Sequence, residues 1–142
     1  MLIKSLIHSQ GETIPSWYTP ITEDMLREMT QRIVEAFQPE KIILFGSYAY
    51  GEPAFHSDID LLVVTNRHRR KSVFERDRLV ATAARPRGVA MDVIVRTPAE
   101  VARRLKIGDP FFREVMNKGQ VLYEKSKINF HRATLSFRRN LF

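Results

Sequence analysis

Two aspartates near the middle of the chain are the residues whose type and spacing most clearly suggest chemistry. Asp58 and Asp60 stand two positions apart at the head of an apolar run, and side chains at such positions of a strand share one face. Their carboxylates should therefore converge and repel each other, which raises the pKa of each unless a cation lies between them. Oxygen ligands without His or Cys suit Mg²⁺, or Mn²⁺ in its place, rather than zinc.

A third acid, Asp92, lies inside another apolar run, Met91–Val95, where it needs a compensating partner. If the two runs are neighbouring strands, Asp92 completes a cluster that can hold two metal ions about 3.5–4 Å apart, as in nucleotidyl displacement. One ion would hold a triphosphate and the other would activate the attacking hydroxyl, with Asp92 as metal ligand and general base. The alternative is an edge-strand aspartate that only reaches solvent.

A Gly-Ser pair directly follows a further apolar run, and ten residues separate it from Asp58. Gly46 allows the backbone to approach a ligand closely, and Ser47 offers an amide and a hydroxyl. If Ser47 opens a short helix through Tyr50, the free N–H groups there form a site suited to phosphate. We therefore predict nucleotide binding at Gly46 and Ser47, with Gly51 releasing the chain into a loop.

The elements that must position these residues can be predicted from apolar spacing and from helix caps. Short apolar runs predict strands at 41–45, 59–65 and 91–95, with a last short strand at 120–124. Helical spacing and cap residues predict helices that open at Thr22, Ser72, Thr97 and Asp109. This order of elements predicts an α/β or α+β domain, in which helices cover a sheet.

Length and composition limit the class of protein. A chain of 142 residues supports one compact domain, and the absence of Cys excludes disulfides and thiolate chemistry. The net charge of +7 is uneven, because residues 125–142 carry five basic side chains and no acid. No apolar run approaches a membrane span, and the start lacks the pattern of a signal peptide, so we expect a cytoplasmic protein without a membrane partner.

The Gly46-Ser47 pair, the Asp58-x-Asp60 pair and the later lone Asp92 together resemble the polymerase-beta-type nucleotidyltransferase superfamily. The short length resembles its minimal nucleotidyltransferases, the antitoxin halves of two-gene modules with HEPN-domain RNase toxins. The resemblance covers about residues 22–124 and leaves an N-terminal extension, 1–21, and a basic C-terminal tail, 125–142.

The resemblance implies a small mixed β-sheet flanked by helices, a nucleoside triphosphate and Mg²⁺ as ligands, and transfer of a nucleoside monophosphate. In the antitoxin group the implied reaction is adenylylation, from ATP, of a tyrosine hydroxyl on the partner toxin. The implied metal-binding and catalytic residues are Asp58, Asp60 and Asp92. Two rival functions stay open: a small-molecule nucleotidyltransferase of the aminoglycoside-modifying kind, and a module that neutralises a partner by contact alone.

Several features leave both a functional and a structural interpretation open. The basic run Arg67–Lys71 follows the aspartate-bearing strand and could attract triphosphate or RNA, although a solvated loop is the interpretation we favour. The basic and aromatic tail could also touch nucleic acid or a partner. Tyr48 and Tyr50 could stack on a base or accept a nucleotide, but packing is the commoner role. The oligomeric state is left open, a homo-oligomer included.

Overall fold

The computed structural model describes Ser16 and residues 20–53, 57–86 and 88–125. Nine elements follow one another along the chain: α1 (Glu23–Phe37), β1 (Lys41–Phe45), the 3-10 turn η2 (Gly46–Tyr48), β2 (Ile59–Val64), α2 (Val73–Ala84), β3 (Met91–Arg96), α3 (Pro98–Lys106), α4 (Pro110–Lys118) and β4 (Gln120–Glu124). The tail 126–142, the residues 1–15 and His56 lie outside the described residues.

The four strands form one mixed sheet in the order β3-β2-β1-β4. β1 pairs antiparallel with both of its neighbours, whereas β2 and β3 are parallel. Parallel neighbours need a crossover connection, and α2 supplies it between β2 and β3. Within the described residues, β3 and β4 are therefore the edge strands.

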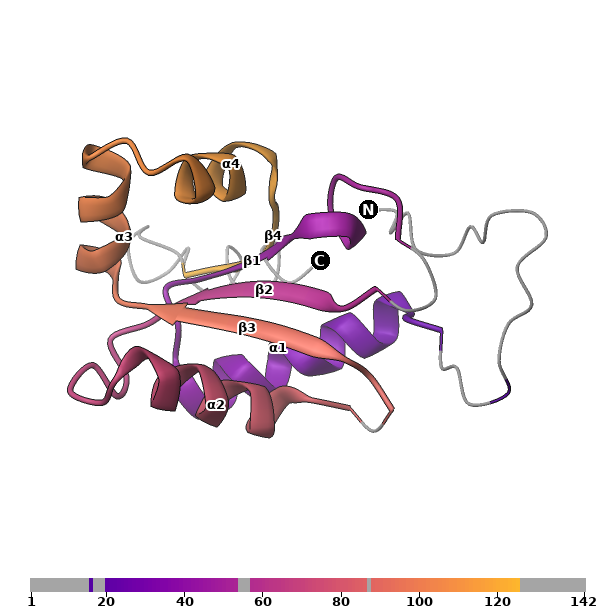
Figure 1. Ribbon diagram of the computed structural model, residues 1–142. Coiled ribbons are helices and arrows are strands. Elements are labelled where there is room, and N and C mark those ends of the chain that lie inside the picture. Colours follow the sequence, from indigo (N-terminus) through magenta and orange to yellow (C-terminus); the bar gives the residue numbers. More distant parts are fainter. Residues whose placement is uncertain (1–15, 17–19, 54–56, 87, 126–142) are drawn as a thin grey trace, which may run out of the picture.

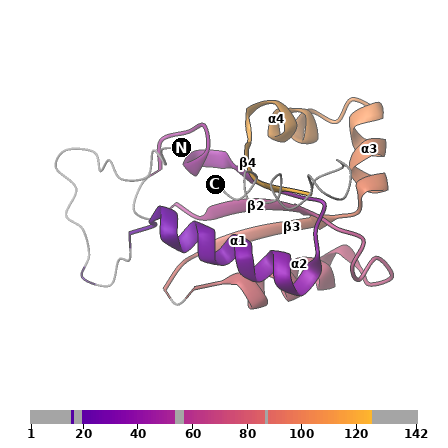
Figure 2. The same ribbon diagram turned by 180° about the vertical axis from the view of Figure 1, so that it is seen from behind.

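Helices cover both faces of the sheet, α1 and α2 on one side and α3 and α4 on the other (Figures 1 and 2). The alternation of strand residues separates two cores. Ile59, Leu61 and Val63 pack with the α1 and α2 face, while Leu62 and Val64 pack with the α3 and α4 face. Nearly every position of β2 is buried for this reason, and Asp60 is the half-buried exception.

Local signals set the helix ends. Thr22 accepts from Met25 N at the start of α1, and Asp109 caps α4 just before Pro110. Ser72 and Thr97 form the two expected capping boxes, in which the Ser or Thr hydroxyl and a glutamate three residues later satisfy each other's backbone N–H groups. The predicted helix starts are thus confirmed.

The predicted fold class is confirmed, since a small mixed sheet lies between pairs of helices. The short helix considered from Ser47 through Tyr50 is a single 3-10 turn over Gly46–Tyr48 in the structure. Such a turn is too short to contribute a helix dipole. No helix among the described residues combines the length and the apolar character that a membrane crossing requires.

Candidate functional site

The three predicted acids meet at one end of the sheet because β2 and β3 are in parallel register. Asp60 stands directly opposite Asp92 across the two strands. Ile59 and Leu61 are fully buried in the core on the α1 and α2 side, so the alternation places Asp60 on the opposite face. Asp58 directly precedes β2, and it lies close enough for its charge to act on the Asp60 carboxylate. The condition that the three-acid cluster required, namely that the two aspartate-bearing segments lead into neighbouring strands, is met.

The charges at this end are coupled. The pKa of Asp60 is raised from 3.8 to about 6, first by burial and then by the negative charges of Asp92 and Asp58. A half-buried carboxylate between two other carboxylates is costly to ionise unless a cation or proton compensates it. The site thus has the electrostatic character of a place that attracts cations.

Asp60 also lies against the Gly-Ser turn. Phe45, the last residue of β1, pairs with Asp60, so the chain turns at Gly46 immediately beside the carboxylate. Gly46 has φ +72°, and a Cβ there would overlap Oδ2 of Asp60. A glycine is therefore required here by the backbone conformation and by the close approach of the Asp60 carboxylate. From the sequence, the close approach was expected to be that of a ligand.

Sequence reasoning missed the structural role of Gly51. A Cβ at this position would lie 2.8 Å from Cα of Ser47, so the returning chain packs directly on the serine. The signal in the sequence was a second glycine four residues after Ser47, which we had interpreted only as a loop start. Gly51 thus holds the turn that carries Ser47.

The packing interpretation of the two tyrosines fits their surroundings. Tyr48 is 2% exposed and belongs to the core on the α1 and α2 side. Tyr50 is half-buried and packs on the opposite core. Tyr48 is thus unavailable as an exposed base-stacking group.

Asp92 differs from the expectation in one respect. Its side chain is exposed on the edge strand β3, so it needs no partner to offset burial. Both interpretations of this residue agree with its exposure, but its register opposite Asp60 is what the metal-cluster hypothesis requires. The AMP transfer activity of an Asp92 variant would distinguish the two interpretations.

The acids fit a divalent cation by their chemistry, because all three are hard oxygen donors and they raise the local negative potential. As they stand, however, no three His, Cys, Asp or Glu side chains within the described residues are arranged to hold a metal ion. Binding would therefore need the carboxylates to turn toward a common ion.

The basic run Arg67–Lys71 lies at the other end of the sheet. It follows Val64, which pairs with Lys41 at the start of β1, whereas Asp60 pairs with Phe45 at its end. Thr65 is five positions after Asp60 along the chain, which corresponds to about 17 Å of extended strand. A direct role of this run in holding a triphosphate at the acids is therefore ruled out by position.

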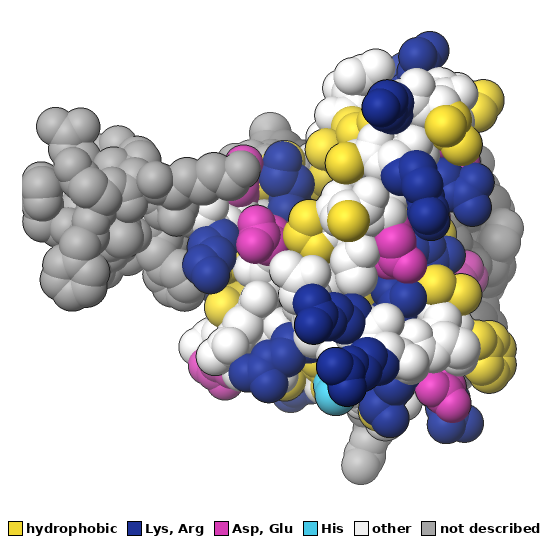
Figure 3. All heavy atoms as spheres, turned by 90° about the vertical axis from the view of Figure 1, so that its left-hand side faces the viewer, with side chains coloured by type: hydrophobic (Ala, Val, Ile, Leu, Met, Phe, Trp, Pro, Cys, Tyr) yellow, Lys and Arg dark blue, Asp and Glu magenta, His cyan; other side chains and the backbone are white. Residues whose placement is uncertain are grey.

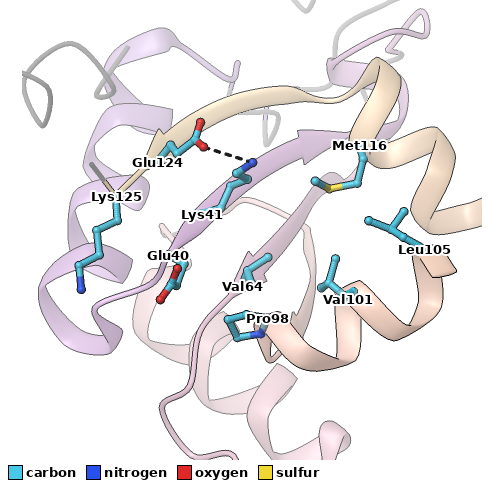
Figure 4. A pocket seen from close by; sticks show the side chains of 10 residues that line it. Glu40, Lys41, Val64, Pro98, Val101, Leu105, Met116, Glu124 and Lys125 are labelled. Carbon is cyan, nitrogen blue, oxygen red and sulfur yellow. Dashed lines mark ion pairs between the residues drawn. The ribbon is translucent and has the colours of Figure 1, made fainter. Parts of the chain in front are cut away.

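A hollow of about 220 Å³ is also remote from the acids (Figure 4). Its apolar lining comes from the end of β2 and from α3 and α4, and includes Val64, Val101, Leu105 and Met116. The ion pair between Lys41 and Glu124, 3.4 Å long, lies at its rim. Its lining includes none of the three aspartates.

A comparison with known protein families places most of the chain in one family. The model of the family described as "Nucleotidyltransferase domain" matches residues 26–129, well over half of the chain. The chain belongs to this nucleotidyltransferase family. The matched range includes the Gly-Ser turn and all three aspartates of the site, so the residues singled out from the sequence lie inside the family domain.

Two similar proteins can be compared with this chain, one in sequence and one in fold. A candidate protein adenylyltransferase from Methanocaldococcus jannaschii is 36% identical over 87 residues, which cover 59% of this chain and 78% of that protein. The crystal structure of a candidate nucleotidyltransferase from Sulfolobus solfataricus superposes with a TM-score of 0.53 at 24% identity, over 74% of this chain and 82% of that one. The second likeness concerns the fold alone.

Proposed function

We propose that this nucleotidyltransferase-family protein transfers AMP from ATP to a hydroxyl group of a partner protein and releases pyrophosphate, with Mg²⁺ as cofactor. The observation that carries the proposal is the register of Asp60 opposite Asp92 beside the Gly46-Ser47 turn. This arrangement brings potential metal ligands, a general base and a phosphate-binding turn to one end of the sheet.

Each residue has a role that its position supports. The hydroxyl and backbone N–H of Ser47 would bind the triphosphate, and Gly46 keeps the turn close to Asp60. Asp58 and Asp60 would hold the metal ions, which when bound neutralise phosphate charge and lower the pKa of the attacking hydroxyl. Asp92, exposed at the sheet edge, can be reached by a macromolecular acceptor, whose hydroxyl it would orient and deprotonate.

A protein acceptor is supported by the relative from Methanocaldococcus jannaschii, whose name describes it as a candidate protein adenylyltransferase. The resemblance to minimal nucleotidyltransferases extends the proposal to a tyrosine of a HEPN-type toxin, with the present chain as its antitoxin. The solvent exposure of Asp92 agrees with an acceptor that approaches from outside the molecule.

The test is transfer of label from ATP carrying a radioactive α-phosphate to the protein encoded by the neighbouring gene, with Mg²⁺ present. We expect labelling of a tyrosine by the wild type and none by the Asp58→Asn/Asp60→Asn variant. In parallel, Mn²⁺ with ATP should raise the melting temperature of the wild type only, because a ligand that prefers the folded state stabilises it. An unchanged melting temperature together with no labelling would overturn the proposed activity. If an aminoglycoside added to the same assay is labelled and the protein is not, the proposal of a protein acceptor is overturned.

A further inference from the structure

We propose that residues 67–71, here called the basic loop, and the neighbouring Phe74 form a binding surface for single-stranded nucleic acid. This surface lies at the end of the sheet opposite the three aspartates. The proposal is independent of the transfer reaction, because none of its residues belongs to the candidate active site.

The basic loop is held in place by specific contacts on its inner side. The N–H of Arg67 donates to Oγ1 of Thr65 at 3.1 Å, and that hydroxyl donates to the carbonyl oxygen of Phe37 at 2.9 Å. Arg67 Nη2 donates to Gln38 at 2.9 Å. His68 adopts the left-handed conformation, φ 59°, with its ring edge-on to Phe37. These contacts therefore fix the conformation of the loop within the fold.

The far end of the loop is tied to the protein interior as well. The carbonyl oxygen of Lys71 accepts from Nε of Arg76, which is 5% exposed. The guanidinium of Arg76 in turn makes two hydrogen bonds to Glu100, at 2.7 and 3.1 Å. A loop anchored to a partly buried ion pair presents its outward side chains in a defined arrangement, which lowers the ordering cost of binding.

The outward side chains are cations without a partner among the described residues. Arg69, Arg70 and Lys71 are exposed, and within the described part of the chain their side chains have no hydrogen bond or ion pair. The loop contains no acid to neutralise them. Arg103 and Lys106, on α3 at the same end of the molecule, likewise have no side-chain partner among the described residues.

Seen from this end, Lys and Arg side chains extend from the loop region up to α3, with fewer acids among them (Figure 3). The described surface there is suited to a chain of negative charges rather than to a single anion. A polyanion gains affinity at such a surface by releasing its condensed counterions.

An exposed aromatic ring favours nucleic acid over other polyanions. Phe74 is 74% exposed in the first turn of α2, three residues after Lys71, and the adjacent Val73 is 40% exposed. Cations that follow a backbone, combined with a ring on which a base can stack, are the two parts of single-strand recognition. An acidic protein segment would use the cations but would have no need of the ring.

The test is fluorescence anisotropy of a labelled oligouridylate of about 20 nucleotides, longer than a typical single-strand site. Three variants are compared with the wild type: Arg69→Ala/Arg70→Ala/Lys71→Ala, Phe74→Ala, and the control Arg27→Ala/Arg32→Ala/Lys118→Ala. The control removes the same charge from surface ion pairs on α1 and α4. All substituted side chains are exposed, so the melting temperatures should stay within a few degrees of the wild type.

We expect the loop variant to bind at least about 10-fold more weakly and to lower the slope of log Kd against log salt by about 2, since each phosphate contact of a single strand contributes about 0.7. Phe74→Ala should weaken binding by about 5-fold or more with an unchanged salt slope, because stacking involves no counterion release. The control should bind as the wild type does.

Three results would overturn the proposal. The first is equal weakening by the control and loop variants, which would mean that only net charge matters. The second is full affinity of Phe74→Ala together with displacement of the RNA by poly-glutamate of matched length, which would indicate an acidic protein partner. The third is tighter binding of a duplex than of the single strand, which would exclude a role for base stacking.

Discussion

Oδ2 of Asp60 occupies the space into which a side chain at Gly46 would extend, at the point where β1 ends and the Gly-Ser turn begins. Gly46 has φ +72°, and a side chain there would overlap Oδ2 of Asp60. The position of the acid and the identity of the turn residue therefore depend on each other. This contact joins the proposed phosphate-binding turn to the proposed metal ligands.

The contact predicts the effect of Gly46→Ala. The new methyl group must displace Asp60, and the left-handed backbone adds about 1–2 kcal/mol of strain. We expect AMP transfer to fall by about 10²-fold or more, as for other small misplacements of reacting groups. Transfer assays and thermal melts on the same preparation measure both effects.

Gly108→Ala is the matched control for this experiment. Gly108 has φ +82°, but the atom nearest a Cβ there is Nη2 of the flexible Arg113, at 3.4 Å. The control should lose similar stability and keep normal transfer. Equal transfer by both variants would contradict the proposed dependence of Asp60 on Gly46.

A second prediction concerns the pH dependence of stability at Asp60. Its pKa of about 6 in the folded protein lies above the ordinary 3.8, so the folded state binds this proton more tightly than the unfolded state. The contribution of Asp60 is present below about pH 4 and is lost as the pH rises through 6. Asp60→Asn should therefore be more stable than the wild type at about pH 7.5, by about 1 kcal/mol after solvent screening, and equal to it near pH 4.

Urea unfolding without divalent cations, followed across this pH range, measures the difference. Asp24→Asn is the control, because its side chain is 93% exposed in the first turn of α1. That variant should be slightly destabilised at about pH 7.5, by less than about 0.5 kcal/mol, because it removes an acid near the helix N-terminus. A stability gain in Asp60→Asn that is as large at pH 4 as at pH 7.5 would show that charge is not its cause.

The third prediction distinguishes the two interpretations of Asp92. If it is the general base, Asp92→Asn should lower AMP transfer by about 10²-fold or more, while nucleotide binding through Ser47, Asp58 and Asp60 largely survives. An exposed edge residue without a function should tolerate the change, with a stability difference within about 0.5 kcal/mol. Three measurements on the variant decide whether Asp92 is the general base: AMP transfer, ATP binding by calorimetry and a thermal melt. Normal transfer would leave a site of two carboxylates, Asp58 and Asp60.

The fourth prediction concerns the ion pair between Arg76 and Glu100. The guanidinium of Arg76 holds the pKa of Glu100 down at about 2, below the ordinary 4.5. A depressed pKa contributes stability that is full above about pH 4.5 and is lost as the pH falls through 2. Glu100→Gln should therefore cost about 2 kcal/mol at neutral pH, because it leaves a buried guanidinium without its counter-charge. The deficit should shrink as the pH approaches 3.

Chemical unfolding at several pH values checks this prediction. Glu28→Gln is the control, since Glu28 pairs with Arg32 on the exposed face of α1 and should cost less than about 0.5 kcal/mol. Because Arg76 also anchors the basic loop, Glu100→Gln should in addition weaken oligouridylate binding. A pH-independent deficit would assign the loss to packing rather than to charge.

The sequence alone predicted the features of this protein that depend on neighbouring residues. The helix starts could be predicted from the cap residues, because a cap acts on backbone groups within three residues of itself. These residues are Thr22, Ser72, Thr97 and Asp109. The two-residue spacing of Asp58 and Asp60 likewise predicted that the two acids lie close together, since alternation is a property of any strand. In the structure Asp58 directly precedes β2, and its charge acts on Asp60.

Other features were decided by the tertiary structure alone. The sequence placed Asp92 on a strand but could not show that the strand lies parallel to β2 with Asp92 opposite Asp60, because register depends on how the α2 crossover packs. It placed Arg67–Lys71 next to the aspartate-bearing strand, yet a strand has two ends, and the length of β2 carries the loop away from the acids. The overlap that forbids a side chain at Gly46 arises only when β1 and β2 pair, since it joins residues 14 positions apart in the chain.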